Sequence, residues 1–130
     1  MAQAGKSILI IEDEADTNLF LETALKGEGY RAQGVLSGRE GLERLQQDDS
    51  VDLVLLDIMM HDIDGIETCR QIREQRDAAT LPVCMITASV DIEKVVESFK
   101  AGANGYIVKP FELDELLNKV RELTAAANPA

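Results

Sequence analysis

The chain has 130 residues, and 24 Asp and Glu against 13 Lys and Arg give it a formal net charge of −11 with its one histidine neutral. That length suits a single domain, which buries roughly two-thirds of its unfolded surface and needs no disulfide or metal to hold a core. Because strong negative charge repels phosphate backbones and anionic lipid surfaces, we expect neither direct nucleic-acid binding nor membrane attachment. No apolar run approaches the roughly 20 residues of a membrane span, so we expect a cytoplasmic protein.

The first third of the chain predicts a strand, a helix and a second strand. Residues 8–11 are consecutively apolar, which suits a strand covered on both faces. Leu21 and Leu25 mark the apolar side of the helix that follows. A strand is needed before the next helix, and only residues 30–35 are available for it. Because this stretch is polar and contains Gly34, we place it at an edge of the sheet.

The later elements alternate in the same way. Ser37 and Glu40 have the spacing of a capping box at a helix start, and Asp91 is expected to cap a later helix. Three more buried strands are predicted by the apolar runs at residues 53–56, 83–86 and 106–108. The helices carry apolar residues at helical spacing: Leu42 and Leu45; Ile66, Cys69 and Ile72; Ile92, Val95, Val96 and Phe99; Leu113, Leu116, Leu117 and Val120. A strand followed by a helix, five times over, predicts an α/β fold with a parallel sheet and helices on both faces.

This pattern describes one domain over residues 1–130, with a core of about residues 7–123. The first few residues and the tail from Ala125 to Ala130 are expected to be disordered. Cys69 and Cys84 have no CxxC spacing and no neighbouring histidine, so neither a zinc site nor a redox pair is indicated. Each cysteine lies within an apolar pattern, which predicts a buried free thiol.

A residue that carries charge or donates a hydrogen bond follows each of the four buried runs. These residues are Glu12 and Asp13, Asp57, Thr87, and Lys109. In an open parallel sheet, ligands bind beyond the carboxyl ends of the strands, near the point where the strand order reverses. Polar residues often end strands simply because the chain reaches water, but these positions share one end of the sheet and are chemically complementary. We therefore expect three carboxylates, a hydroxyl and an ammonium at one rim.

Three crowded carboxylates repel one another unless a positive charge lies among them. Oxygen ligands, with no histidine or thiol expected among them, favour Mg²⁺ over zinc or copper. The metal would neutralise the charge that develops during phosphoryl transfer, and Lys109 would do the same from the other side. Asp57 is then the carboxylate best placed to attack phosphorus, while Glu12 and Asp13 hold the metal.

Several motifs together carry a family resemblance. They are Glu12-Asp13, the run 53–57 followed by Asp64-Gly65, Thr87-Ala88, and Lys109-Pro110-Phe111. In this order and at this spacing, from about Ser7 to Leu123, they resemble the receiver domain of response regulators in two-component systems. The resemblance implies a flavodoxin-like, doubly wound sheet of five parallel strands in the order 2-1-3-4-5, with five helices on both faces.

The resemblance also implies the chemistry of the site. Asp57 would be the phosphoacceptor and would take its phosphoryl group from a sensor histidine kinase or a histidine phosphotransfer protein. Mg²⁺ would be held by Glu12, Asp13, Asp57 and the backbone carbonyl of Met59. Such a chain is a phosphoprotein of a phosphorelay, and it catalyses only its own phosphorylation and dephosphorylation.

Further residues receive roles from the resemblance alone. The catalytic residues Thr87 and Lys109 would each contact a phosphoryl oxygen, and the Lys109–Pro110 peptide would be cis. Tyr106 matches an aromatic position that turns inward when Thr87 moves, although a strand-end aromatic with its hydroxyl in solvent is the alternative interpretation. The output is a change of affinity for a downstream protein, and a phosphorylation-dependent dimer is among the partners that the resemblance allows.

The chain departs from the family pattern in the acceptor loop. His61 occupies the place of the usual proline four residues after the acceptor; it is either an exposed residue without a function or a titratable group that tunes the phosphoryl lifetime. Met59 and Ser89 match positions that shape the access of water to the phosphoryl group. We hypothesise that an apolar Met59 slows hydrolysis, because it offers no group to orient the attacking water.

Two other functions remain open beside the signalling switch. An aspartyl-phosphate phosphohydrolase also uses an Asp nucleophile after a strand, but it needs a second acid two positions later, where this chain has Met59. A pseudo-receiver would bind partners without phosphorylation, although every acidic, hydroxyl and lysine position is intact here. Both a free-standing regulator and a piece of a larger kinase or regulator are compatible with these motifs.

Overall fold

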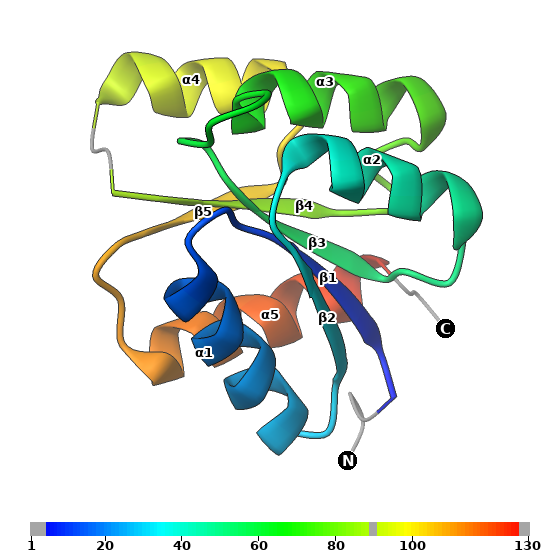
Figure 1. Cartoon of the computed structure of the whole chain (residues 1–130), viewed down its shortest axis with the longest axis vertical. Helices are drawn as coiled ribbons and strands as arrows, with labels where there is room; N and C mark the ends of the chain where they lie inside the picture. The colour runs from blue at the N-terminus through cyan, green and yellow to red at the C-terminus, as the bar shows by residue number, and fades with distance from the viewer. Residues whose placement is uncertain (1–4, 89–90, 128–130) are drawn as a thin grey trace.

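The computed structural model describes residues 5–88 and 91–127. Within these ranges five strands and five helices alternate, as the sequence predicts (Figure 1). The elements are β1 (Ser7–Ile11), α1 (Ala15–Gly27), β2 (Arg31–Val35), α2 (Gly38–Gln47), β3 (Leu53–Asp57), α3 (Gly65–Gln75), β4 (Val83–Thr87), α4 (Ile92–Lys100), β5 (Gly105–Val108) and α5 (Leu113–Ala127).

The strands form one parallel sheet in the order β2-β1-β3-β4-β5, which confirms the order that the resemblance implies. The stretch placed at an edge from its polarity is the edge strand β2. Helices α1 and α5 cover one face of the sheet, and α2, α3 and α4 lie along the other (Figure 1). Since every strand runs in the same direction, the residues that follow the strands gather at one edge of the sheet.

Alternation along the strands divides the core into two layers. In β1, Leu9 and Ile11 pack with apolar residues of α2 and α3 on one face. Ile8 and Ile10 pack with residues of α1 and α5 on the opposite face. A strand buried on both faces must be apolar throughout, which explains why the central strands read as continuous apolar runs.

Side-chain caps begin three of the helices. Ser37 Oγ accepts a hydrogen bond from the Glu40 amide at 3.1 Å, as the capping-box spacing predicts. Asp91 caps α4 by accepting from the Glu93 amide at 3.0 Å, which is also predicted. Asp64 caps α3 in the same way. These caps fix the helix starts that lie beside the carboxyl edge of the sheet.

The C-terminal end differs from expectation. Helix α5 continues through Ala125 to Ala127, which we expected to be disordered. Alanine has the highest intrinsic helix propensity, which favours continuation of the helix through this short alanine run. The expected disorder of residues 1–4 and 128–130 concerns residues outside the described ranges.

Two further expectations concern buried thiols and membranes. Cys69 and Cys84 are free and buried, as predicted, and burial raises the pKa of the Cys84 thiol to about 12.

Across residues 5–88 and 91–127, no helix combines the length and the apolar character that a bilayer crossing requires.

Candidate functional site

The polar residues at the strand ends meet in one hollow at the carboxyl edge of the sheet. Glu12 and Asp13 follow β1, Asp57 ends β3, and Lys109 follows β5. These four side chains line a hollow of about 310 Å³ together with Glu14, Met59 and Ala88. One oxygen from each of the three site carboxylates lies within 4.8 Å of the others. The structure therefore brings together the acidic residues that the sequence singles out.

Lys109 lies between two of the carboxylates. Its ammonium is 2.7 Å from Glu12 Oε1 and 3.2 Å from Asp57 Oδ2. Burial raises the pKa of Glu12, and the nearby Asp57 adds to this effect, while the ammonium of Lys109 opposes it. Burial alone would lower the pKa of Lys109, but the two carboxylates outweigh it and raise that pKa above its usual value. The lysine is thus held as a cation inside an acidic cluster.

The orientation of Asp57 is fixed by donors on both of its oxygens. Oδ1 accepts a hydrogen bond from the Met59 amide at 3.1 Å, while Oδ2 faces Lys109. Behind Asp57, the first residue of α3 comes very close to the backbone: a Cβ on Gly65 would lie 2.2 Å from the Asp57 carbonyl oxygen. The Asp64-Gly65 motif thus has a physical reason, since Asp64 caps α3 and Gly65 leaves space for the Asp57 backbone.

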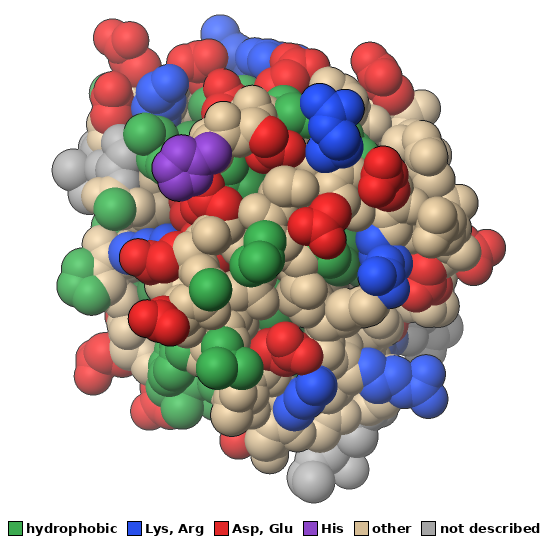
Figure 2. Space-filling model, viewed as in Figure 1, with side chains coloured by type: hydrophobic (Ala, Val, Ile, Leu, Met, Phe, Trp, Pro, Cys, Tyr) green, Lys and Arg blue, Asp and Glu red, His purple; other side chains and the backbone are tan. Residues whose placement is uncertain are grey.

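The loop from β3 to α3 is hydrogen-bonded both to Asp13, which follows β1, and to the start of α2. The His61 amide donates to Asp13 Oδ2 at 2.9 Å, and the His61 ring Nδ1 lies 2.5 Å from the same oxygen. The His61 side chain is 97% exposed, and in Figure 2 the purple histidine lies at the surface beside acidic side chains. On the other side, the Asp62 carboxylate accepts from the amides of Gly38 and Arg39 at the start of α2.

Sequence reasoning expects an exposed His61 but misses both of these connections. Burial tends to raise the pKa of Asp62, but hydrogen bonds from backbone amides outweigh it and lower the pKa below its usual value. Asp62 lies 24 and 23 residues from Gly38 and Arg39, so no local spacing reveals its contact with α2. Acidic side chains generally interact favourably with the amides at a helix N-terminus. That Asp62 faces the start of α2 becomes visible only once the fold is known.

Thr87 and Tyr106, the residues proposed to respond to the phosphoryl group, lie on neighbouring strands. Thr87 is buried at the end of β4, and its carbonyl accepts a hydrogen bond from the Lys109 amide at 2.7 Å. The Tyr106 side chain is 39% exposed and meets Phe99 of α4 edge to face, with ring centroids 6.1 Å apart. The Lys109–Pro110 peptide is cis, as the resemblance implies. Ser89 lies outside the described residues.

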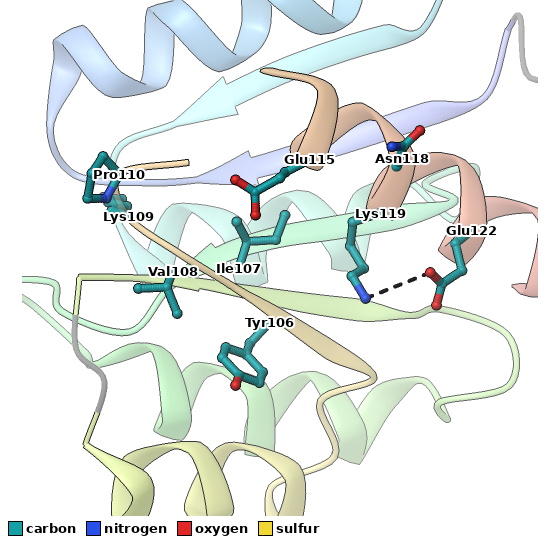
Figure 3. A pocket seen from close by; sticks show the side chains of 9 residues that line it. All are labelled: Tyr106, Ile107, Val108, Lys109, Pro110, Glu115, Asn118, Lys119 and Glu122. Carbon is teal, nitrogen blue, oxygen red and sulfur yellow. Dashed lines mark ion pairs between the residues drawn. The ribbon is translucent and has the colours of Figure 1, made fainter. Parts of the chain in front are cut away.

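A second, larger hollow lies on the side of β5. It has a volume of about 700 Å³ and lies between β5 and α5. Figure 3 shows Tyr106 pointing toward α4, while Glu115, Lys119 and Glu122 project from α5. Lys109 contributes to both hollows, so the acidic site and this surface share one residue.

The comparisons with known proteins agree with this geometry. The profile of the response regulator receiver domain family matches residues 8–121. The response regulator ArlR of Staphylococcus saprophyticus is 41% identical over 116 residues, and ArlR of Staphylococcus aureus is 40% identical. These alignments cover 89% of this chain and 51% of ArlR, so the chain spans about half the length of the curated relatives it matches.

Solved structures share the whole fold. A putative response regulator from Chloroflexus aurantiacus superposes with a TM-score of 0.86 at 35% identity, covering 93% of this chain and 98% of that one. The response regulator TrrA from Thermotoga maritima, solved in complex with Mg²⁺-BeF, has a TM-score of 0.81 at 34% identity, covering 91% of this chain and 98% of that one. Fold, site and sequence agree: the chain belongs to the receiver domain family of two-component response regulators.

Proposed function

We propose that Asp57 accepts a phosphoryl group from a phosphohistidine on a sensor histidine kinase or a histidine phosphotransfer protein. A carboxylate oxygen of Asp57 attacks phosphorus, the bond from phosphorus to the donor's imidazole nitrogen breaks, and the imidazole leaves. The observation that carries the proposal is the convergence of Glu12, Asp13 and Asp57, with one oxygen of each within 4.8 Å of the others, beside the ammonium of Lys109. Carboxylates in this arrangement can hold a divalent cation, and that cation and the ammonium would stabilise the charge that develops on a phosphoryl group.

The donor set fits Mg²⁺. Glu12, Asp13 and Asp57 offer carboxylate oxygens close enough to contact one cation, and the backbone carbonyl of Met59 is proposed as a further ligand. Support comes from the structure of TrrA, which holds Mg²⁺-BeF and is 34% identical to this chain. When bound, Mg²⁺ supplies positive charge against the transferring phosphoryl group. Lys109, whose ammonium is 3.2 Å from Asp57 Oδ2, would supply a second positive charge.

Phosphorylation would shift the balance between two conformations. A phosphoryl group on Asp57 brings about −1.5 to −2 charges and new acceptor oxygens. We assign the Thr87 hydroxyl and the Lys109 ammonium to these oxygens. Lys109 already lies 3.2 Å from Asp57 Oδ2, so the rearrangement is assigned to Thr87. Tyr106 would then turn inward from its exposed position beside Phe99, so the equilibrium shifts toward a second packing of this face.

The surface around Tyr106 is suited to a protein partner. Helix α4 has exposed apolar side chains at Ile92, Val96 and Phe99, and the hollow beside β5 adjoins Tyr106. Exposed apolar residues that cluster on one element are typical of contact surfaces. We therefore assign the change of partner affinity to this face. A phosphorylation-dependent dimer would be one form of it, and the proposal includes a cytoplasmic location.

The signalling switch is favoured over its two alternatives by particular residues. Met59, which follows the acceptor by two positions, lies on the rim of the hollow and offers no acid for the proton transfer that a phosphohydrolase needs. A pseudo-receiver would not need Lys109 between Glu12 and Asp57.

The test is incubation with Mg²⁺ and acetyl phosphate, followed by intact mass spectrometry of the parent and the Asp57→Asn variant. We expect one phosphoryl adduct on the parent and none on the variant, with Asp64→Asn as a matched control that keeps the adduct. An adduct of equal amount on Asp57→Asn would overturn the proposal. Turnover of small phosphate esters by the parent would instead favour the phosphohydrolase.

A further inference from the structure

Asn18 is a buried polar residue on the inner side of α1. The buried residues of this helix are Asn18, Leu21 and Leu25, and Asn18 is only 5% exposed. Burying an amide without hydrogen bonds is unfavourable, so a polar residue in this position requires hydrogen-bond partners. Apolar side chains would serve better if the position only had to fill the core.

The Asn18 amide group holds two strand ends together. Nδ2 donates to the backbone carbonyl of Glu12 at 2.9 Å and to the carbonyl of Val35 at 2.8 Å. The Glu12 amide also donates to the Val35 carbonyl, at 3.2 Å. Glu12 is the first residue after β1 and Val35 is the last residue of β2. One side chain therefore fixes the backbone from which two of the three site carboxylates extend.

Gly34 leaves the space that Asn18 occupies. A Cβ on Gly34 would lie 1.8 Å from Asn18 Oδ1 and 2.8 Å from Asn18 Cγ. Any other residue at position 34 would displace the carboxamide from its two partners. This also explains why a glycine lies inside the edge strand β2, where it would otherwise weaken the strand.

We infer that Asn18 is a positioning residue of the carboxylate site, and that Gly34 is its partner. Asn18 acts through the backbone of Glu12, whose side chain must reach Lys109 at 2.7 Å, and through the adjoining Asp13. Outer contacts of this kind hold metal-binding carboxylates in place, and losing one typically weakens metal affinity about 10- to 100-fold. The inference rests on the proposed function, because it takes Mg²⁺ as the ligand.

The test is the Mg²⁺ dissociation constant of four proteins, measured by isothermal titration calorimetry. Asn18→Ala removes the donors, whereas Gly34→Ala keeps Asn18 but displaces its carboxamide. For each single variant we expect binding about tenfold weaker than in the parent. The double variant should bind no more weakly than Asn18→Ala alone, because the methyl group of residue 34 no longer meets a carboxamide.

A matched control separates positioning from stability. Thr124→Val removes another buried hydrogen bond, from Thr124 Oγ1 to the Val120 carbonyl at 2.8 Å in α5. We expect this variant to lose stability in urea but to bind Mg²⁺ like the parent. If Asn18→Ala does not fold, Gly34→Ala decides the question with the asparagine intact.

Two results would overturn the inference and leave the proposed function standing. Binding by the folded variants within twofold of the parent would show that Asn18 does not position the site. Equal weakening in Thr124→Val would show that the affinity follows overall stability. A parent that binds no Mg²⁺ would instead overturn both the proposed function and this inference. The two failures are therefore distinguishable, because failure of the inference alone leaves Mg²⁺ binding by the parent intact.

Discussion

At the scale of single residues, Lys109 would compete with the proposed Mg²⁺ for the same carboxylates. Its ammonium is 2.7 Å from Glu12 Oε1 and 3.2 Å from Asp57 Oδ2, so it already neutralises part of the acidic cluster. We expect Lys109→Met to bind Mg²⁺ about tenfold more tightly, which corresponds to about 1.4 kcal/mol, and to be phosphorylated more slowly. Calorimetry at pH 8, with Lys119→Met of α5 as control, checks this; weaker binding would contradict it.

Met59 gives a second prediction at this scale. Its side chain is 63% exposed on the rim of the acidic hollow, where water would approach a phosphoryl group on Asp57. We expect Met59→Asn to shorten the lifetime of the phosphorylated state about threefold or more, because an amide can orient the attacking water. Met59→Leu should leave the lifetime unchanged. Equal lifetimes for the parent and Met59→Asn, followed by intact mass over time, would discard the idea.

At the scale of elements, the start of α3 limits which residue can follow Asp64. Helix propensity alone favours Gly65→Ala by about 1 kcal/mol. A Cβ there would lie 2.2 Å from the Asp57 carbonyl oxygen, so the sign reverses, and we expect a loss of about 1–3 kcal/mol in the free energy of unfolding.

Gly27 is the matched control for Gly65, because a Cβ at this position in α1 would have no heavy atom within 4 Å. Gly27→Ala should be neutral or stabilising in the same urea titration. A Gly65→Ala variant as stable as the parent would refute the steric argument, whereas a destabilised variant that is also slow to phosphorylate would link α3 to the acceptor.

Helix α2 gives a pH-dependent prediction through Asp62. Its carboxylate accepts hydrogen bonds from the Gly38 and Arg39 amides, which lower its pKa below the usual value. Because the pKa of Asp62 is lower in the folded protein than in the unfolded chain, its carboxylate contributes to the free energy of unfolding at any pH above the unfolded-state pKa. This contribution is lost as the pH falls through the folded-state pKa. We expect Asp62→Ala to lose about 1 kcal/mol of stability at pH 7 and much less at pH 3. Asp49→Ala is the exposed control, and a difference that persists at pH 3 would contradict this account.

At the scale of the whole molecule, the parts predicted from sequence are those with a local pattern. The runs at residues 8–11 and 53–56 show buried strands directly, because burial on both faces demands continuous apolar residues. Knowing the strand ends is enough to place Asp57 and Lys109 at one edge, since the strands are parallel.

The supporting contacts could not be predicted in this way. Asn18 meets Val35, and Asp62 meets the start of α2, across 17 and 24 residues of sequence. Neither contact has a spacing that a periodic pattern records. The first depends on how α1 packs against the end of β2, and the second on how the loop after β3 approaches the start of α2. The strand-end residues of the site are therefore visible in the sequence, while the residues that hold them in position require the fold.

The most direct measurement identifies which carboxylate carries the phosphoryl group. The protein is incubated with acetyl phosphate, with Mg²⁺ or with EDTA; borohydride then reduces the acyl phosphate to an alcohol, and peptide mass spectrometry locates the reduced residue. We expect reduction at Asp57 alone, and only when Mg²⁺ is present. Reduction at another residue, or equal reduction at Asp57 in EDTA, would contradict the account.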